Sequence, residues 1–187
     1  MIITITGPRS VGKSTISKIV ARKIRLKYVS SDKIGDKALK KIGGLNKAIK
    51  SGLIKEIVKN KGYNLIIKEY NKDNFVFDLS GGSFAYTDFP KATKEVRDIA
   101  KQKSIVIGLL PFKDESKSVK LLFEREKQRK HLSEVDPKGL FERTKRRYKN
   151  FPLIFKNFCD NIIYTENKNP ESIAEEIVSL LKNSKKV

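Results

Sequence analysis

The chain has almost none of the residue types that build disulfide scaffolds or histidine-based metal centres. Among its 187 residues there is one cysteine, Cys159, one histidine, His131, and no tryptophan. A single cysteine cannot form an internal disulfide, which fits a reducing compartment, and a single histidine excludes a metal cluster built on histidines. No apolar run approaches the roughly 20 residues of a membrane-spanning helix. We therefore expect a cytoplasmic protein without membrane contacts.

Acidic residues are also scarce relative to basic ones. There are 21 Asp and Glu against 41 Lys and Arg, which gives a formal net charge of +20 at pH 7. Such a charge invites nucleic-acid binding. However, the lysines are spread through every segment, without an arginine-rich arm or an aromatic-plus-basic RNA-binding signature. Nucleic-acid binding stays possible but is not favoured over a lysine-rich enzyme surface with anionic ligands.

The chain is organised around a glycine-rich motif, GPRSVGKST, which fits the phosphate-binding pattern G-x-x-x-x-G-K-[ST]. Its glycines permit backbone angles and close approaches that let successive N–H groups surround an anion. Lys13 would supply a charge to the β- and γ-phosphates, and the Ser14 hydroxyl would ligate Mg²⁺. The motif predicts that ATP and Mg²⁺ are bound by Gly7, Pro8, Arg9, Ser10, Val11, Gly12, Lys13, Ser14 and Thr15.

The sequence on either side supplies the context that this motif requires. A β-rich run at residues 2–6 precedes it, and because this run opens the chain we expect no signal segment. After Lys13, the residues Ile16, Val20 and Ile24 repeat at helical spacing. A strand, a glycine loop and a helix in this order favour a true phosphate-binding loop over a glycine turn that binds nothing.

Strand and helix signals alternate throughout, which predicts one domain, residues 1–187, with a parallel sheet covered on both faces. The expected strands span residues 2–6, 26–29, 74–79, 104–110 and 161–164. The expected helices span residues 13–25, most of 33–70, 91–101, most of 113–158, and a final segment from Pro170. Ligands of such sheets bind beyond the carboxyl ends of the strands, so the segments that follow the strands are the candidate sites.

Two carboxylates occupy such positions. Asp32 follows the second expected strand, where it would accept the proton of a substrate hydroxyl or would only cap a helix. Asp78 ends an apolar strand, FVFD, where its carboxylate would help to hold Mg²⁺ or would only occupy a turn. The next residues, Ser80-Gly81-Gly82, form either a plain turn or a close backbone approach to a small ligand.

Arginines are concentrated in the second half of the chain. Arg129, and secondly Arg125, lie in a mixed-charge run that by default is a solvated helix face. Phosphoryl transfer nevertheless needs cations over the γ-phosphate, and a mobile basic lid supplies them. A second group is spaced three or four residues apart and would bind a carboxylate or phosphate: Arg143, Arg146 and Arg147.

Together these motifs resemble those of shikimate kinase, a branch of the nucleoside-monophosphate-kinase-like P-loop enzymes. The corresponding segments follow in order: GPRSVGKST, SSD for D-[ST]-D, SGG for the glycine triplet, REKQRKHL for the lid pattern R-D-K-x-R-P-L-L, and YTENKNPE for D-T-x-x-x-x-P-E. The resemblance implies a three-layer α/β/α P-loop kinase fold with a five-stranded parallel sheet. It also implies a helical substrate-binding segment at about 33–62 and a mobile lid at about 113–135.

The resemblance further implies ATP-dependent phosphorylation of a hydroxyl on a small anionic metabolite, shikimate, by a protein expected to be a monomer. Lys13, Asp32 and Arg129 would be catalytic, and Mg²⁺ would lie at Ser14 and at Asp78, which we infer replaces the carboxylate missing at Ser30. Substrate would be bound by Asp32 together with Lys59, Ser80, Gly81, Gly82 and Arg147. The nucleotide would also be contacted by Arg125, Asn169 and Pro170.

The sequence also departs from this pattern. The family's F-R-x-x-E motif reads VKNKG, so Lys59 keeps a charge but loses the arginine fork. Asn150-Phe151-Pro152 stands where the family has an arginine before P-L-Y, so Arg147 or Arg146 would have to serve. The segments YVSSDKIGDKA and RRYKNFPLI resemble adenylate kinase. A nucleoside monophosphate kinase is therefore the alternative, and an RNA-associated ATPase or kinase is a third.

Overall fold

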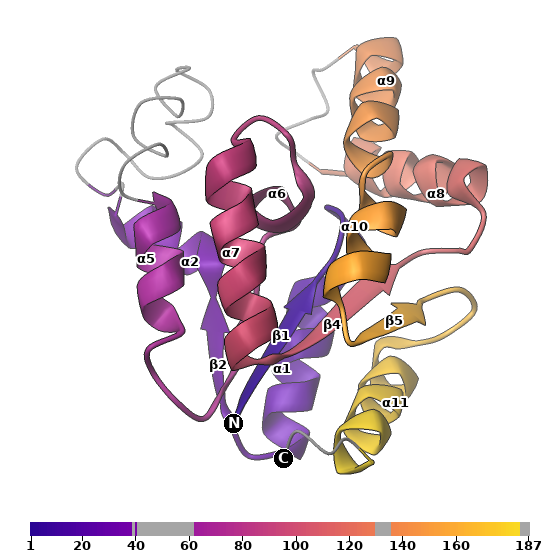
Figure 1. Cartoon of the computed structure of the whole chain (residues 1–187). Helices are drawn as coiled ribbons and strands as arrows, with labels where there is room; N and C mark the ends of the chain where they lie inside the picture. The colour runs from indigo at the N-terminus through magenta and orange to yellow at the C-terminus, as the bar shows by residue number, and fades with distance from the viewer. Residues whose placement is uncertain (39, 41–61, 130–135, 184–187) are drawn as a thin grey trace.

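The computed structural model describes residues 1–38, 40, 62–129 and 136–183, and these residues form a five-stranded sheet with helices on both faces (Figure 1). All strands pair in parallel, in the order β2-β3-β1-β4-β5. The predicted α/β/α fold is confirmed, and each strand lies within one residue of its predicted bounds. The strands are β1 (Ile2–Thr6), β2 (Lys27–Ser30), β3 (Phe75–Asp78), β4 (Ile105–Leu110) and β5 (Asn161–Tyr164).

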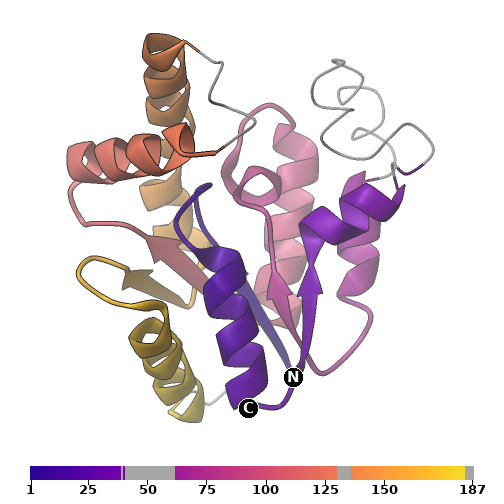
Figure 2. The same ribbon diagram turned by 180° about the vertical axis from the view of Figure 1, so that it is seen from behind.

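Two opposite views show how the helices are distributed over the sheet (Figures 1 and 2). Helices α1 and α11 cover one face, α7 and α10 cover the other, and α8 and α9 stand together beyond the carboxyl ends of the strands. The described helices are α1 (Lys13–Lys23), α2 (Ser31–Ala38), α5 (Tyr63–Glu69), α6 (Gly81–Ala85), α7 (Pro90–Lys103), α8 (Glu115–Lys127), α9 (Pro137–Tyr148), α10 (Phe151–Phe158) and α11 (Pro170–Lys182).

The three central strands, β1, β3 and β4, are buried along their whole length. Helices on both sides exclude water from them, which is why they read as continuous β-branched and aromatic runs. Thr4 is the polar residue in the middle of β1, and it is fully buried. Its hydroxyl lies 3.0 Å from the Tyr70 hydroxyl and 2.8 Å from that of Ser104. Because these partners satisfy it, the threonine is tolerated in the core.

Helix α6 is where the structure differs most from the sequence-based expectation. The segment Ser80-Gly81-Gly82 was predicted to be a loop, but Gly81 begins a short helix. Two glycines disfavour a helix by about 1 kcal/mol each. Burial compensates for this, because Phe84 and Ala85 in the same turn are fully inaccessible to solvent. Tertiary packing therefore overrides local propensity at this position.

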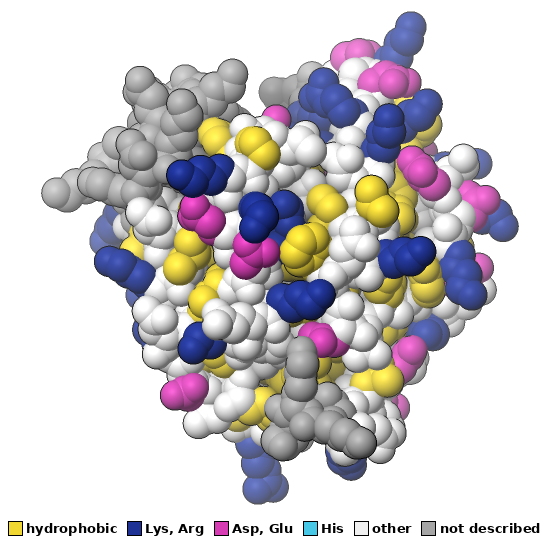
Figure 3. Space-filling view, in the orientation of Figure 1, with side chains coloured by type: hydrophobic (Ala, Val, Ile, Leu, Met, Phe, Trp, Pro, Cys, Tyr) yellow, Lys and Arg dark blue, Asp and Glu magenta, His cyan; other side chains and the backbone are white. Residues whose placement is uncertain are grey.

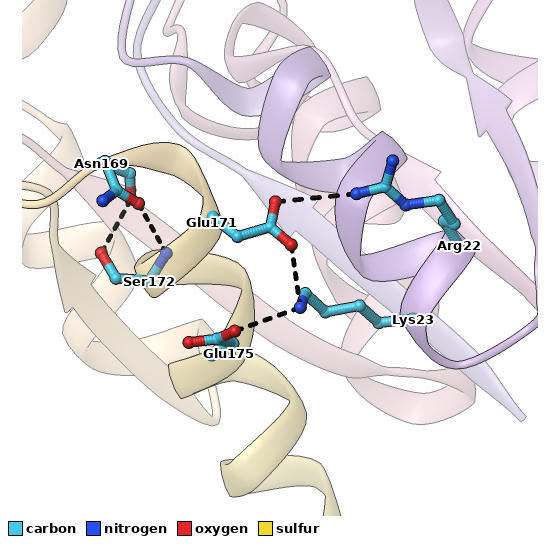
Figure 4. Close-up of polar contacts among 6 residues, drawn as sticks. All are labelled: Arg22, Lys23, Asn169, Glu171, Ser172 and Glu175. Atoms are coloured by element: carbon cyan, nitrogen blue, oxygen red, sulfur yellow. Dashed lines mark hydrogen bonds and ion pairs between the residues drawn. The ribbon is translucent and has the colours of Figure 1, made fainter.

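Helix α11 is attached to α1 through both apolar and charged contacts (Figure 4). Its amino end is capped by Asn169, whose Oδ1 accepts a hydrogen bond of 2.8 Å from the Ser172 backbone N–H. Glu171 lies 2.8 Å from Lys23 Nζ and 3.7 Å from Arg22. These ion pairs are exposed and contribute little. The apolar faces of the two helices, buried in the core, supply most of the attachment.

Parts of two predicted segments lie outside the described residues. They are most of the substrate-binding segment at 33–62, including Lys59, and residues 130–135 of the lid. The described part of the lid is largely helix α8, whose first turn is capped by the Asp114 carboxylate through the Lys117 N–H at 2.7 Å. Among the described residues, no helix has the length and apolar character needed to cross a membrane.

The packing of α10 on β4 can be tested at Gly108. A Cβ atom there would lie 2.7 Å from Cε2 of Phe155 and 2.9 Å from Sγ of Cys159. We expect Gly108→Ala to lower the free energy of unfolding by about 1–3 kcal/mol, because a packed core resists an added methyl group. Chemical denaturation measures this change.

The matched control is Gly62→Ala. No described atom lies within 4 Å of a Cβ at Gly62, which has ordinary helical angles. Its stability should change by less than about 1 kcal/mol. Equal stability of the Gly108 variant and the wild type would contradict the observed contact between α10 and β4.

Candidate functional site

The glycine-rich motif forms a preorganised phosphate cradle between β1 and α1. Ser10 and Gly12 have positive φ angles of 67° and 104°. Gly12 is the N-cap of α1, and no described side chain caps this helix, so its first N–H groups are available to an anion. Lys13 bends back over the loop, and its Nζ donates a 2.9 Å hydrogen bond to the Pro8 carbonyl. Buried Val11 anchors the loop to the core.

Glycines at two positions allow helix α6 to lie in close contact with this loop. A Cβ at Gly81 would collide with the Gly7 carbonyl and would lie 2.9 Å from the Phe151 ring. A Cβ at Gly7 would in turn lie 2.6 Å from the Leu109 carbonyl oxygen. Gly81 therefore has a packing reason to be glycine, since it is buried against the loop. Contact of Gly81 and Gly82 with a substrate stays a prediction.

Asp78 and Ser30 are direct neighbours on the adjacent strands β3 and β2. This register places the Asp78 carboxylate beside the position where the shikimate kinase pattern has its first carboxylate. Asp78 is buried, and the Tyr28 hydroxyl donates a 2.8 Å hydrogen bond to its Oδ2. Ser14 and Ser30 interact with the same phenol oxygen. The structure thus joins Ser14 and Asp78 through one tyrosine.

Tyr28 was not predicted as a site residue, although its position carries a weak signal. It lies two residues before Ser30, and alternate residues of a strand share a face. Burial, and secondly the Asp78 charge, raise the pKa of Tyr28 to about 12. The phenol therefore stays protonated near neutral pH and remains a hydrogen-bond donor to the carboxylate.

The donor chemistry of Ser14 and Asp78 fits Mg²⁺. Hydroxyl and carboxylate oxygens are hard ligands, and Mg²⁺ usually takes one or two protein ligands together with phosphates and waters. Within the described ranges there is no group of three or more His, Cys, Asp or Glu that could hold a metal by itself. The donor set therefore suits a metal that arrives with a nucleotide.

Asp32 and Lys13 lie within electrostatic reach of each other at this end of the sheet. Asp32 is in the first turn of α2, and desolvation raises its pKa above the ordinary value, with Lys13 opposing the shift. Burial lowers the pKa of Lys13, while Asp78 and Asp32 act in the opposite direction. The start of α2 is fixed against α6, because the Ser80 N–H donates to Ser31 Oγ at 2.8 Å.

Arginines from three segments surround the same loop. The charge of Arg129, just after α8, acts on Lys13, and its own pKa is lowered first by desolvation and then by Arg9. Arg125 Nη1 donates to the Ser10 carbonyl at 3.3 Å. From α9, the guanidinium of Arg147 lies 5.1 Å from the centroid of the Tyr86 ring. The predicted Arg125, Arg129 and Arg147 are therefore gathered at the phosphate loop.

Other predicted positions are not brought into this cluster. Arg146, considered beside Arg147, is exposed. Asn169 and Pro170 are exposed, and the Asn169 side chain is engaged in capping α11. Their proximity to adenine stays a prediction, as does the substrate role of Lys59, which lies outside the described residues. The sequence gives no sign of Glu126 and Tyr86, because nothing in a charged helix or a turn shows that Glu126 is buried and Tyr86 partly buried beside the arginines.

Comparison with known proteins places this architecture among P-loop kinases. No protein-family model matches the chain. In sequence it is 27% identical to the cytidylate kinase of Sulfurisphaera tokodaii, over 97% of this chain and 95% of that protein. In structure it is similar to the shikimate kinase of Acinetobacter baumannii in complex with shikimate, with a TM-score of 0.75, 18% identity, and coverage of 100% of this chain and 95% of that one.

A second solved shikimate kinase, from Bacteroides thetaiotaomicron, gives the same result. Its TM-score is 0.72 at 17% identity, and the match covers 97% of this chain and 98% of that one. The predicted likeness to shikimate kinases is thus confirmed at the level of the fold. The chain has a P-loop kinase fold, and the proteins it is similar to are kinases named for different substrates.

The role of Tyr28 can be tested by removing its hydroxyl. We expect Tyr28→Phe to raise the Mg²⁺ concentration needed for half-maximal activity about tenfold, because a hydroxyl that donates to a metal-binding carboxylate fixes its orientation. A Mg²⁺ titration at saturating ATP measures this.

Tyr70→Phe is the matched control, because it removes a hydroxyl that pairs with Thr4 in the core, away from the site. It should lower stability without changing the Mg²⁺ dependence. Identical Mg²⁺ titrations for the Tyr28 variant and the wild type would show that this tyrosine does not orient Asp78.

Proposed function

We propose that the protein is an ATP- and Mg²⁺-dependent phosphotransferase that acts on a small anionic acceptor. The observation that carries this proposal is the convergence of Lys13, Asp32, Asp78 and Arg129 beyond the carboxyl ends of the strands. This arrangement offers cations for a polyphosphate, oxygen ligands for a metal, and a carboxylate for a hydroxyl proton. A module that only binds nucleotide needs no such carboxylate.

Each side chain has a defined task in this proposal. Lys13 exchanges its hydrogen bond with the Pro8 carbonyl for one with a phosphate oxygen, and with Arg129 it neutralises charge on the transferred phosphoryl group. Ser14 and Asp78 would hold Mg²⁺, which would supply positive charge against the phosphates. Where the acceptor is a hydroxyl, Asp32 accepts its proton, and its raised pKa makes it a better base than an ordinary aspartate. A phosphate acceptor is already ionised near neutral pH and needs no such base.

The residues of the chain favour a nucleoside monophosphate as acceptor over shikimate. The shikimate kinase pattern places arginines where this chain has Lys59 and the segment Asn150-Phe151-Pro152, so the fork that would bind a ring carboxylate is missing at both places. The similarity to the Sulfurisphaera cytidylate kinase extends over nearly the whole chain. We therefore rank cytidine monophosphate first.

Shikimate is the second candidate. The fold similarity to shikimate kinases supports it, and so does the placement of Arg147 beside Tyr86 and the phosphate loop. In that case Arg147 would bind the carboxylate in place of the arginine missing from the segment 150–152. A substrate hydroxyl would then lie at Asp32, as the resemblance implies.

An RNA-associated activity has weaker support. In the view of Figure 3, Lys and Arg side chains are scattered over the face and mixed with acidic and apolar ones, without one continuous basic surface. Because nucleic-acid binding relies on clustered cations, it would show a steep dependence on salt concentration. The cations that the structure does gather are those at the phosphate loop.

Phosphoryl transfer depends on Lys13 in this proposal. We expect Lys13→Ala to lower kcat about 100-fold or more, since it removes a cation that meets charge developing in the transition state. ADP release in a coupled assay measures kcat, and circular dichroism shows whether the fold persists. The control is Lys94→Ala, which breaks only an exposed ion pair with Asp98 on α7. Full activity of the Lys13 variant would overturn the site assignment.

The acceptor is identified by ADP release from Mg²⁺-ATP with shikimate, AMP, CMP, UMP, a short RNA or no acceptor. We expect CMP to give the highest kcat/KM. Turnover with shikimate alone would contradict this ranking and would assign the carboxylate site to Arg147. Release that does not depend on any small acceptor would contradict the phosphotransferase proposal itself.

A further inference from the structure

Glu126 is a buried carboxylate to which the proposed chemistry assigns no task. It lies in the last turn of α8 and only 4% of its surface is exposed. Its Oε2 is 4.0 Å from Nη2 of Arg143 on α9. The charge of Glu126 also acts on Arg129 and on Tyr86. Burying a carboxylate this deeply costs free energy unless a partner compensates for its lost hydration.

The surroundings of Glu126 are rich in cations. Within the described residues, four arginines meet around it: Arg9 from the phosphate loop, Arg129 after α8, and Arg143 and Arg147 from α9. The pKa of Arg143 is lowered, first by desolvation and then by Arg147. The arginines therefore repel one another in the absence of an anion, and Glu126 is a buried negative charge among them, while Asp32 also acts on Arg129.

Arg143 itself is held by charge more than by hydrogen bonds. Its Nε and Nη2 are buried and have no hydrogen-bond partner among the described residues. At 4.0 Å the contact with Glu126 is an ion pair but is too long for a hydrogen bond. These two donors are thus unused, while Glu126 helps to line a small pocket together with Pro8, Arg9 and Arg147.

We propose that Glu126 is a positioning residue that assembles the arginine cluster before the polyphosphate binds. Its carboxylate offsets the repulsion between Arg143 and Arg9, and so joins α9 to the phosphate loop. The edge-to-face contact of Phe123 on α8 with Phe141 on α9, at 5.3 Å between centroids, holds the helix pair that carries the carboxylate and Arg143. Glu126 does not touch the reacting atoms and acts through the arginines.

A counter-charge role for Glu126 and a purely structural role predict different effects of added anions on the stability of a Glu126 variant. Where Glu126 serves only as a packing residue, its loss lowers stability equally with and without a bound polyphosphate. As a counter-charge, its loss is compensated by any polyanion that occupies the cluster. The proposal rests on the proposed kinase function only for its effect on kcat, because anion binding requires no acceptor.

The test compares Glu126→Gln with the wild type, because glutamine keeps the shape and removes the charge. We expect the melting temperature of the anion-free variant to fall by about 5 °C, and tripolyphosphate to restore most of this loss. Glu124→Gln is the matched control on the same helix, since Glu124 forms an exposed pair with Lys127 at 3.3 Å. It should melt like the wild type in both conditions.

Steady-state kinetics provides the second measurement. We expect Glu126→Gln to lower kcat about tenfold or more, because small displacements of charge-bearing groups are costly in catalysis. The KM for ATP should stay within about threefold of the wild type, because the added positive charge compensates for the misplaced arginines. Equal losses in stability with and without tripolyphosphate, or an unchanged kcat, would overturn the proposal.

A double variant provides a second test of the counter-charge role in case the single variant does not fold. Adding Arg143→Gln to Glu126→Gln removes both charges, and the anion-free protein should recover stability relative to the single variant. Additive losses would instead contradict the counter-charge role. A wild type that binds tripolyphosphate but phosphorylates no acceptor would refute the proposed function while leaving the assembly role of Glu126 standing.

Discussion

Mutual repulsion among the cations at the phosphate loop is the constraint on which the site depends. Lys13 and the arginines that surround it are held in a partly desolvated space, where their charges interact strongly. Carboxylates are interleaved with them: Asp78 and Asp32 act on Lys13, while Glu126 acts on the arginines. In the proposed function this arrangement is balanced in advance for a polyphosphate with its metal, which would replace part of this compensation on binding.

The fold meets this requirement by stacking rigid elements at one end of the sheet. Parallel pairing brings the ends of β1, β2 and β3 to one edge of the sheet, where Asp78 lies between Ser30 on β2 and Ile5 on β1. The close approach of Gly81 to the Gly7 carbonyl fixes α6 against the phosphate loop. Helices α8 and α9, which pack on each other, place arginines on the other side of the phosphate loop. Each contribution comes from a different part of the chain, and the sheet sets their relative positions.

Much of this could be predicted from the sequence, where local patterns are enough. The phosphate loop, the strands and the placement of Asp32 and Asp78 at strand ends follow from motif spacing and from the geometry of parallel sheets. Even the replacement of a carboxylate at Ser30 by one at Asp78 could be inferred, because adjacent parallel strands end side by side. The structure shows them as direct neighbours.

The rest depends on tertiary contacts that leave little trace in the sequence. Helix α6 was hidden by Gly81 and Gly82, whose low helix propensity is offset by the burial of Phe84. Glu126 lies in a run of charges that is typical of a solvated helix face, and only the packing of α8 on α9 buries it. Tyr28 likewise gains its role through a partner 50 residues away. Burial of polar groups is decided by the assembled fold.

The central claim is that the gathered charges direct the γ-phosphoryl group of ATP to an acceptor and not to water. The most direct test follows the reaction of the wild-type protein with Mg²⁺-ATP and CMP by ³¹P NMR. The account predicts the growth of nucleoside diphosphate signals from CDP and ADP in equal amounts, without a matching rise of inorganic phosphate. Growth of inorganic phosphate alongside ADP, with CMP unchanged, would contradict it.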